Sequence, residues 1–273
     1  MSKKEQSTTT IFVCISSKGG VGKTTVSNML ASYIYNQTNT PVNYFEVDQE
    51  NQNVKSLSKS QILNPSLVAL ENLKKLLEES IMWEGDTVLD IGGNASTTTF
   101  INHLKLTGGF LAKTIYFIPL SESDQDIINA KDTHSSIREF DQESQIVYVL
   151  NKCQNKSNVE LTNRQFINFH GSDILGVEPT TMDKHTTYIA MDYNTIYNVT
   201  GRLGKTIYEL SSDNYDDEYK TVAQEFFKDK SNQDLYKQVR RLMFLKEMTS
   251  IAREVVEKEY LDLFAQIKKI QKS

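Results

Sequence analysis

A glycine-rich run bounded by lysines, Lys18-Gly19-Gly20-Val21-Gly22-Lys23-Thr24-Thr25, has the residue types and the spacing to hold phosphate groups. Glycines allow successive backbone N–H groups to turn toward an anion, and the N-terminus of a following helix adds partial positive charge. In such a loop the Lys23 ammonium reaches the outer phosphates of a nucleotide, and the Thr24 hydroxyl can ligate Mg²⁺. The run therefore predicts a site for a nucleoside triphosphate, with residues 19–25 as its cradle.

The segments on either side of this run fit a phosphate-binding loop. Residues 11–15 are all apolar, which is typical of a buried strand, and apolar residues recur at helical spacing over residues 26–34. A strand, a glycine-rich turn and a helix that opens on Gly-Lys-Thr form the context that this loop requires. A surface turn with an incidental lysine is the alternative, and the agreement between the motif and its flanks disfavours it.

A second lysine sets this loop apart from the general pattern. Ser17 stands where the pattern has glycine, and Lys18 comes directly before the glycine pair. With these residues the run resembles the deviant phosphate loop of the ParA/MinD-type ATPases. The resemblance implies that ATP is the substrate, that Mg²⁺ accompanies it, and that an ATP-dependent homodimer forms around two ATP molecules. It also implies that Lys18 reaches the partner's nucleotide, where a further cation neutralises charge as an arginine finger does.

Asp90 is the candidate for the carboxylate that holds the metal ion. It lies near the end of the apolar run at residues 87–91 and stands beside a glycine pair. At the carboxyl edge of a parallel sheet, next to the phosphate loop, such a carboxylate holds Mg²⁺ through water. An aspartate that begins a turn is the simpler alternative. The family usually has prolines or small residues after this aspartate, so Ile91 leaves the shape of the second switch loop, residues 91–94, undetermined.

Asp48 is the second candidate carboxylate. Residues 42–48 predict a strand that ends with Glu46 and Asp48, and ParA-like proteins carry two acidic residues one apart at this place. The resemblance implies that Asp48 orients the attacking water or completes the Mg²⁺ shell. The following residues 49–53 resemble the loop of the family only loosely, and a strand-end cap is the simpler alternative.

Two residues are assigned to the nucleotide base by the same resemblance. Asn151 follows the predicted strand at residues 145–150, where an asparagine of this family hydrogen-bonds the adenine. Pro179 marks the segment after the last predicted strand, residues 173–177, and in the family that segment lines the base. Asparagine also ends strands for turn reasons alone, so this alternative stays open for Asn151.

Alternating strand and helix patterns predict an α/β protein. The pattern indicates parallel βαβ units, and therefore a three-layer α/β/α fold with a mostly parallel twisted sheet, as in P-loop NTPases. From residue 215 onward the pattern is helical, and residues 235–270 keep helical spacing without a glycine or proline, which predicts one long helix or two consecutive ones. The other predicted elements are strands at residues 10–16 and 114–120, and helices at residues 24–36, 67–81, 96–106, 124–140 and 161–169.

Composition and charge narrow the class of protein. We divide the chain into a disordered lead (residues 1–9), an ATPase domain (10–230) and a helical tail packed on that domain (231–273). Nine lysines and arginines against six acidic residues give the tail a net charge of +3, in a chain of 273 residues with a net charge of −5. The whole molecule is therefore no basic nucleic-acid binder, and any DNA contact needs a local patch.

The cysteine count and the hydrophobic runs indicate the compartment. Cys14 and Cys153 are too few and too separated for a disulfide scaffold or a zinc cluster, which favours a reducing setting. The polar N-terminus is no signal peptide, and no run is long enough to span a membrane. We therefore expect a soluble, cytoplasmic protein.

The tail offers two candidate surfaces. One is a patch of cations that would bind DNA phosphates without sequence preference, and a solvated helix face is its alternative. The other is the apolar end of the tail, which would lie on a membrane as the last residues of MinD do. Since the apolar stripe continues upstream without a break, packing on the domain is favoured over a membrane. The patch comprises Lys237, Arg240, Arg241, Lys246 and Arg253, and the apolar end comprises Phe264, Ile267 and Ile270.

The resemblance implies a positioning switch. The loop begins so near the N-terminus that the chain resembles the short ParA type, in which an ATP-bound dimer holds bulk DNA and a ParB-like partner stimulates slow hydrolysis; nucleoid association would follow. A MinD-like membrane-associated ATPase and a regulatory ATPase that acts only through protein partners are the alternatives. A ligase of the dethiobiotin synthetase kind is disfavoured by Lys18. A nitrogenase-iron-protein-like reductase is disfavoured by the positions of the two cysteines.

Overall fold

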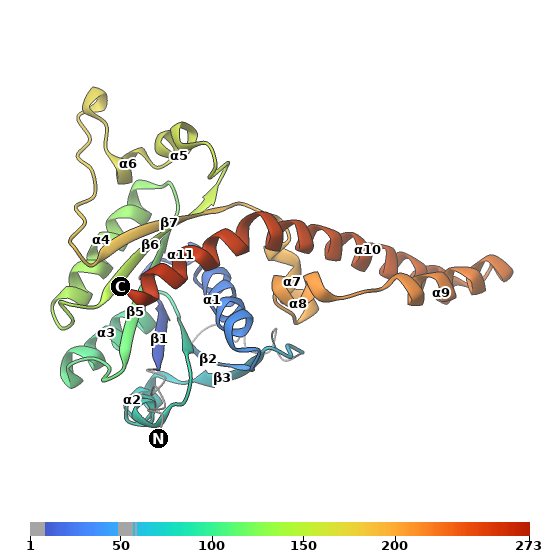
Figure 1. The fold of residues 1–273 in the computed structure, drawn as a ribbon, viewed down its shortest axis with the longest axis horizontal. Helices are drawn as coiled ribbons and strands as arrows, with labels where there is room; N and C mark the ends of the chain where they lie inside the picture. Colours follow the sequence, from blue (N-terminus) through green and yellow to red (C-terminus); the bar gives the residue numbers. More distant parts are fainter. Residues whose placement is uncertain (1–8, 49–56, 58) are drawn as a thin grey trace, which may run out of the picture.

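A seven-stranded parallel sheet forms the centre of the protein. The structure, a computed structural model, describes residues 9–48, 57 and 59–273, so all but the last residue of the lead expected at residues 1–9, and most of the polar segment after Asp48, lie outside the described residues. The strand order is β3-β2-β4-β1-β5-β6-β7, and all neighbours pair in parallel (Figure 1). The carboxyl ends of all these strands therefore meet at one edge. The strands are β1 (Thr10–Cys14), β2 (Val42–Val47), β3 (Leu63–Val68), β4 (Thr87–Ile91), β5 (Lys113–Leu120), β6 (Gln145–Cys153) and β7 (Thr186–Asp192).

Helices cover both faces of the sheet, which confirms the predicted three-layer α/β/α fold. Successive strand residues point to opposite faces, so Phe12 and Cys14 belong to one apolar cluster and Val13 and Ile15 to the other. The first cluster is covered by α1 (Lys23–Thr38), α8 (Ile207–Ser212) and α11 (Leu261–Lys272). The second is covered by α2 (Leu73–Glu79), α3 (Ala95–Thr107), α4 (Asp124–Arg138) and α6 (Ile167–His170), which follows α5 (Val159–Gln165).

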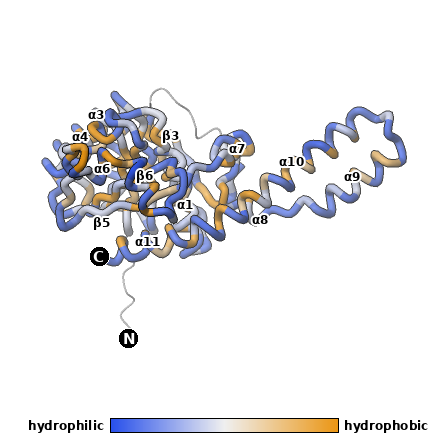
Figure 2. The backbone as a smooth tube through the Cα atoms, turned by 90° about the horizontal axis from the view of Figure 1, so that it is seen from above, coloured by the Kyte–Doolittle hydropathy of each residue, from blue (hydrophilic) through white to orange (hydrophobic). Residues whose placement is uncertain are grey.

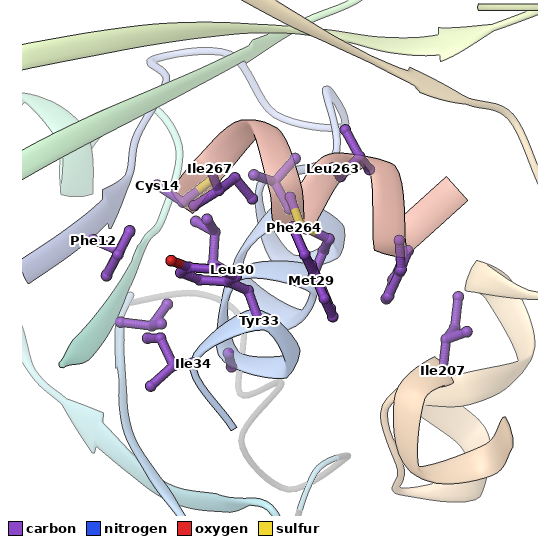
Figure 3. Packing of buried hydrophobic residues seen from close by; sticks show 14 of the residues in the cluster. Phe12, Cys14, Met29, Leu30, Tyr33, Ile34, Ile207, Leu263, Phe264 and Ile267 are labelled. Atoms are coloured by element: carbon purple, nitrogen blue, oxygen red, sulfur yellow. The ribbon is translucent and has the colours of Figure 1, made fainter. Parts of the chain in front are cut away.

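The C-terminal helix α11 lies against α1 (Figure 3). Its residues Leu263, Phe264 and Ile267 are buried. The rings of Phe264 and Tyr33 are 5.7 Å apart between centroids, and the Tyr33 hydroxyl donates to Gln271 Oε1 at 2.6 Å. The apolar tail residues that a membrane surface would need are thus part of the protein core. Within the described residues, no helix is long and apolar enough to cross a membrane.

The first half of the tail leaves the body of the protein. α9 (Asp216–Lys228) and α10 (Gln233–Val255) form an antiparallel hairpin that extends away from the sheet (Figure 1, Figure 2). A π-helical turn, Val256–Tyr260, joins α10 to α11. The tail therefore consists of two consecutive helices, one of the two predicted arrangements. α11 packs on the body, and α10 joins the core cluster only near its C-terminal end, with Met248, Ala252 and Val255.

An edge strand replaces the start of a predicted helix. Residues 63–68 form β3, whereas leucine spacing predicted a helix from residue 67 to residue 81. β3 pairs only with β2, and most of its residues are partly or fully exposed. An edge strand of this kind tolerates Pro65 and lacks the apolar alternation of a buried strand. The helix predicted at residues 67–81 is present from residue 70 onward, as a 3₁₀ turn (Leu70–Asn72), α2 and a second 3₁₀ turn (Ser80–Met82).

The last strand lies later in the chain than predicted. Residues 173–177 are not a strand, because Gly171 and Gly176 have φ values of 83° and 64° and turn the chain there. A short 3₁₀ turn, Asp173–Leu175, lies between these glycines. The last strand is β7, which follows Pro179, and α7 (Tyr197–Leu203) comes after it.

Candidate nucleotide-binding site

The phosphate loop connects β1 to α1 and has the backbone that its glycines allow. Gly20 and Gly22 have φ values of 78° and 98°, a region that residues with a side chain rarely adopt. A Cβ atom at Gly22 would also lie only 1.9 Å from Nδ2 of Asn151. Because α1 begins at Lys23, its unpaired N–H groups face the loop. This is the geometry of an anion site at a helix N-terminus.

A cavity of about 240 Å³ lies beside the loop at the carboxyl edge of the sheet. It brings together three segments: the loop with the start of α1, the end of β2, and the end of β4 with the glycines that follow. A Cβ atom on Gly93 would lie 3.4 Å from both Gly19 N and Lys23 Nζ, so the segment after β4 closely approaches the loop. The lining residues are Gly19, Gly20, Gly22, Lys23, Thr24, Thr25, Glu46, Asp48, Asp90, Ile91, Gly92 and Gly93.

The two lysines of the loop have different surroundings. Lys23 is half-buried, and its ammonium donates a 2.7 Å hydrogen bond to the carbonyl of Lys18. Burial lowers the pKa of Lys23, while the nearby carboxylates of Asp90 and Asp48 oppose that shift. The side chain of Lys18 is exposed. Lys23 thus lines the cavity, and Lys18 stands on the outer surface of the loop.

Asp90 is buried at the base of the cavity. Its carboxylate accepts a 2.9 Å hydrogen bond from the Tyr44 hydroxyl and a further one from Thr24. Burial raises the pKa of Asp90, and these two hydrogen bonds and the Lys23 charge oppose the rise. The contact between Asp90 and Thr24 joins the two groups that were predicted to share Mg²⁺.

The donor set around Asp90 fits magnesium bound with a nucleotide. Among the described residues, no group of three or more His, Cys, Asp or Glu side chains is placed to hold a metal by itself. Mg²⁺ retains several waters and is commonly bound by one or two carboxylates together with substrate phosphates. The Thr24 hydroxyl and the Asp90 carboxylate supply oxygen ligands of that kind.

Asp48 lies at the end of β2, next to the segment that follows β4. Its Oδ1 accepts a 3.2 Å hydrogen bond from the Ser96 hydroxyl. The two strands stay in register past their ends, because Gly92 N–H donates to the Val47 carbonyl at 2.8 Å. A Cβ atom at Gly92 would lie 2.6 Å from the carboxyl carbon of Asp48. The glycine pair therefore lets the Asp48 carboxylate sit against the second switch loop.

The second switch loop is also tied to the phosphate loop. The Thr97 hydroxyl contacts the carbonyls of Ser16, at 3.1 Å, and Gly92, at 2.7 Å, and Asn94 N–H donates to the Ser17 carbonyl. These contacts fix the shape that the sequence left undetermined.

Asn151 supports the phosphate loop from the end of β6. Its side chain is buried, and Nδ2 donates a 2.7 Å hydrogen bond to the Val21 carbonyl. Its Oδ1 accepts from the N–H of Lys152, whose ammonium reaches the Gly20 carbonyl at 3.0 Å. The contacts hold the loop in place. Recognition of adenine by Asn151 stays a prediction.

Pro179 lies away from this cavity. Because β7 follows Pro179, the residue stands before the last strand and lines a separate cavity with His134 and Tyr148. The segment after β7 is the one that approaches the loop: Tyr197 and other residues of α7 share a cavity of about 230 Å³ with Thr25. The assignment of Pro179 to the base is therefore corrected by the position of the last strand.

The five tail cations do not form one continuous free patch. Lys246 makes a 2.7 Å ion pair with an acidic residue at the start of α9, and Arg253 donates to two backbone carbonyls at the C-terminal end of α8, those of Ser211 and Asp213. Lys237 makes a 3.5 Å contact with Asp234 of its own helix. Arg241 lines a cavity of about 500 Å³ at the base of the hairpin. Arg240 lies over the ring of Tyr236.

Several residues of the site were missed from the sequence. No sequence pattern marks Tyr44 as a site residue, since its contact with Asp90 depends on the pairing of β2 with β4. No pattern marks Lys152 either, because its side chain reaches the loop only through a left-handed backbone conformation (φ 63°) that the sequence does not reveal. A detectable signal was present at Ser96 and Thr97, which belong to a hydroxyl-rich run directly after the glycine pair.

The fold is shared with solved structures of nucleotide-binding proteins. The MinC:MinD cell division protein complex from Aquifex aeolicus matches with a TM-score of 0.50 and 15% identity, over 85% of this chain and 95% of the matched chain. MinD from Pyrococcus horikoshii, complexed with Mg-ADP, matches with a TM-score of 0.44 and 12% identity, over 72% of this chain and 87% of the matched chain. A putative plasmid partition protein from Borrelia burgdorferi, bound to AMPPNP, matches with a TM-score of 0.44 and 14% identity, over 70% of this chain and 90% of the matched chain.

These comparisons establish the fold. No protein-family model matches the sequence, and no curated protein matches it either. The resemblance to ParA/MinD-type proteins that the loop indicated is confirmed at the level of the fold by the structural neighbours.

Proposed function

Because this protein has the fold of the MinD/ParA-type P-loop ATPases, we propose that it hydrolyses ATP as a switch that positions or segregates a cargo. The observation that supports this most directly is the convergence of the loop glycines, Lys23, Thr24, Asp48 and Asp90 on one cavity. A cavity with these groups suits a triphosphate and its metal, because anion donors, a cation and oxygen ligands stand side by side.

Each group of the cavity has a role in this proposal. The N–H groups of the loop and of the start of α1 bind the phosphates, and the Lys23 ammonium exchanges the Lys18 carbonyl for an outer phosphate. Thr24 and Asp90 would hold Mg²⁺, which would supply positive charge to neutralise the phosphates. Asp48, held by Ser96, orients the attacking water.

The proposal includes an ATP-dependent homodimer. Lys18 is exposed on the loop and makes no ion pair within the described residues, so its ammonium is available to a second subunit. A lysine supplied across the interface makes ATP both the substrate and the link between subunits. Dimer lifetime would then depend on slow hydrolysis that a ParB-like partner protein stimulates.

We propose bulk DNA as the track of the switch. Arg240 and Arg241 make no ion pair within the described residues, and both are exposed on α10, as is Lys237. Two hairpins in one dimer would double the number of phosphate contacts. The burial of Phe264 and Ile267 disfavours the MinD-like alternative at a membrane, and nucleoid association follows from DNA binding.

A second candidate is an ATPase whose dimer is recognised only by protein partners. The engagement of Lys246 and Arg253 within the chain favours it, since few cations remain for DNA. The named neighbour from Aquifex aeolicus is itself a complex of MinD with a protein, MinC.

Co-sedimentation tests these proposals. Protein with ATP and Mg²⁺ is mixed with plain duplex DNA or with anionic liposomes, and phosphate release is measured in parallel. We expect Mg²⁺-dependent hydrolysis that Lys23→Ala abolishes, and ATP-dependent DNA binding that falls steeply with salt. Hydrolysis without binding to either surface would favour the second candidate. Absence of both ATP binding and hydrolysis would overturn the proposed function.

A further inference from the structure

One face of α10 is uncovered along the hairpin. The face toward α9 and the body carries the buried residues of this helix, among them Leu242, Leu245 and Met248. The opposite face carries two large side chains that remain accessible: Met243 is 53% exposed and Phe244 43%. Tyr236, 43% exposed, lies at the edge of this face, with its ring 5.8 Å from that of Phe226 on α9. Figure 2 shows that the hairpin stands free of the body over most of its length. An exposed stripe of this kind is typical of an interaction surface.

The charges on this helix fall into two groups. Asp234, Lys237, Lys246 and Glu254 each make an ion pair within the chain, and Arg253 binds backbone carbonyls. Three charges, in contrast, have no ion pair with any described residue: Arg241, which lines the cavity at the base of the hairpin, and the two residues Arg240 and Glu247. Arg240 and Glu247 stand seven residues apart on the exposed face, about 10 Å along the helix, which is too far for them to pair with each other.

The arrangement of these residues is self-complementary. Met243 and Phe244 lie midway between Arg240 and Glu247. If two α10 helices cross antiparallel about a two-fold axis at this midpoint, Arg240 of each copy meets Glu247 of the other. The same axis places Tyr236 opposite the half-buried Ile251. A two-fold interface requires that one surface complement itself, and this stripe does so in both charge and apolar content.

We propose that the exposed face of α10 binds the same face of a second copy of this chain, with Met243 and Phe244 at the centre and two Arg240–Glu247 ion pairs around them. The contact does not involve the nucleotide cavity, so it forms with or without ATP. A single pair of helices is smaller than a standard interface of roughly 1,600 Å², so we expect weak association at high protein concentration.

The pairing of α10 has a consequence for assembly. If the proposed ATP-dependent dimer also forms, each subunit carries two different two-fold interfaces. Two such interfaces on one subunit link copies into an open chain unless the geometry closes it. The α10 contact itself does not depend on the proposed function, since it is tested without nucleotide.

Sedimentation velocity of the nucleotide-free full chain over a range of concentrations tests the proposal. We expect reversible self-association in the wild type and a loss of affinity of about tenfold or more in Arg240→Glu and in Glu247→Arg, because each variant places like charges opposite each other. The double variant Arg240→Glu/Glu247→Arg restores the ion pairs in reverse and is expected to restore the affinity. Lys220→Glu on α9 is the matched control and should associate as the wild type does.

Three outcomes would overturn the proposal. They are a wild-type protein that stays monomeric at the highest soluble concentration, single reversals without effect, and a double variant that remains as weak as the single ones. The three substituted positions, Arg240, Glu247 and Lys220, are exposed, and circular dichroism verifies that each variant is folded. The double variant also separates pairing from DNA binding, because it restores the ion pairs at unchanged net charge.

Discussion

The Tyr44 hydroxyl donates a 2.9 Å hydrogen bond to the carboxylate of Asp90, and both side chains are buried. The pKa of Tyr44 is raised well above its usual value by burial and by the Asp90 charge, so the hydroxyl stays protonated and remains a donor. The strand pair β2–β4 therefore sets the orientation of the carboxylate that is proposed to serve the metal.

Tyr44→Phe removes this donor and leaves the buried Asp90 oxygen with one partner fewer. We expect a loss of about 1–3 kcal/mol in the free energy of unfolding and a higher Mg²⁺ concentration for half-maximal ATP hydrolysis. Urea unfolding and Mg²⁺ titrations measure the two effects. Tyr208→Phe is the control, since its hydroxyl bonds Asn36 near the surface and should matter less. Equal losses in both variants would contradict the role given to Tyr44.

Gly22→Ala is expected to destabilise the nucleotide-free protein strongly. Alanine at this position would have to keep a left-handed φ, and its Cβ would lie 1.9 Å from Asn151 Nδ2. Together these two effects should lower the free energy of unfolding by at least about 2 kcal/mol. Thermal unfolding measures the change. Gly19→Ala is the matched control, because a Cβ there meets nothing within 4 Å and should cost far less. Similar melting temperatures for the two variants would show that the loop differs from the one described.

Asn151→Ala tests what this side chain does. Its hydrogen bonds hold the loop, so we expect the KM for ATP hydrolysis to rise about tenfold, and the KM for GTP to rise by the same factor. Steady-state kinetics with both nucleotides decide the point. A rise confined to ATP would contradict this expectation and assign adenine recognition to Asn151, as the family resemblance implies.

Glu259 makes stability depend on pH. Its buried carboxyl accepts from Asp192 N–H at 2.7 Å, and burial raises its pKa from 4.5 to about 7. Between these two pH values the folded protein holds a proton that the unfolded chain has lost. The free energy of unfolding contributed by this group therefore falls as pH rises through that window, by on the order of 3 kcal/mol.

Glu259→Gln cannot ionise and should remove that part of the pH dependence. Urea unfolding at pH 5 and pH 8 is compared between wild type and variant, which cancels the contributions of other titrating groups. The exposed neighbour Glu257→Gln is expected to keep the wild-type difference. An unchanged difference in Glu259→Gln would refute the assignment.

Local patterns predicted most of the fold. The phosphate loop and the strands at its sides are short apolar runs next to glycines, and such signals do not depend on distant residues. β3 was not predicted because it is an edge strand that pairs only with β2, and its residues show little apolar alternation. The misplacement of β7 carried over to Pro179, which was assigned to the base only because the last strand was placed too early.

Contacts between elements that are distant in the sequence could not be predicted from local patterns. Helical spacing predicted the tail as helix, but the spacing is the same where α10 packs on α9 and where α11 packs on α1. The pattern therefore did not reveal that a hairpin leaves the body. In the site, Asp48 and Asp90 were found at strand ends, whereas their hydrogen-bond partners Ser96 and Tyr44 depend on the register of β2 with β4.

The central claim is that two subunits enclose two ATP molecules and that Lys18 of each reaches the other. The most direct test is the mass, by light scattering, of Asp48→Ala with ATP and Mg²⁺, at a concentration where the nucleotide-free protein is monomeric. We predict that Asp48→Ala is a dimer, and that the double variant Asp48→Ala/Lys18→Ala is a monomer although it still binds ATP. A protein that binds ATP yet remains monomeric with Lys18 intact would contradict the account.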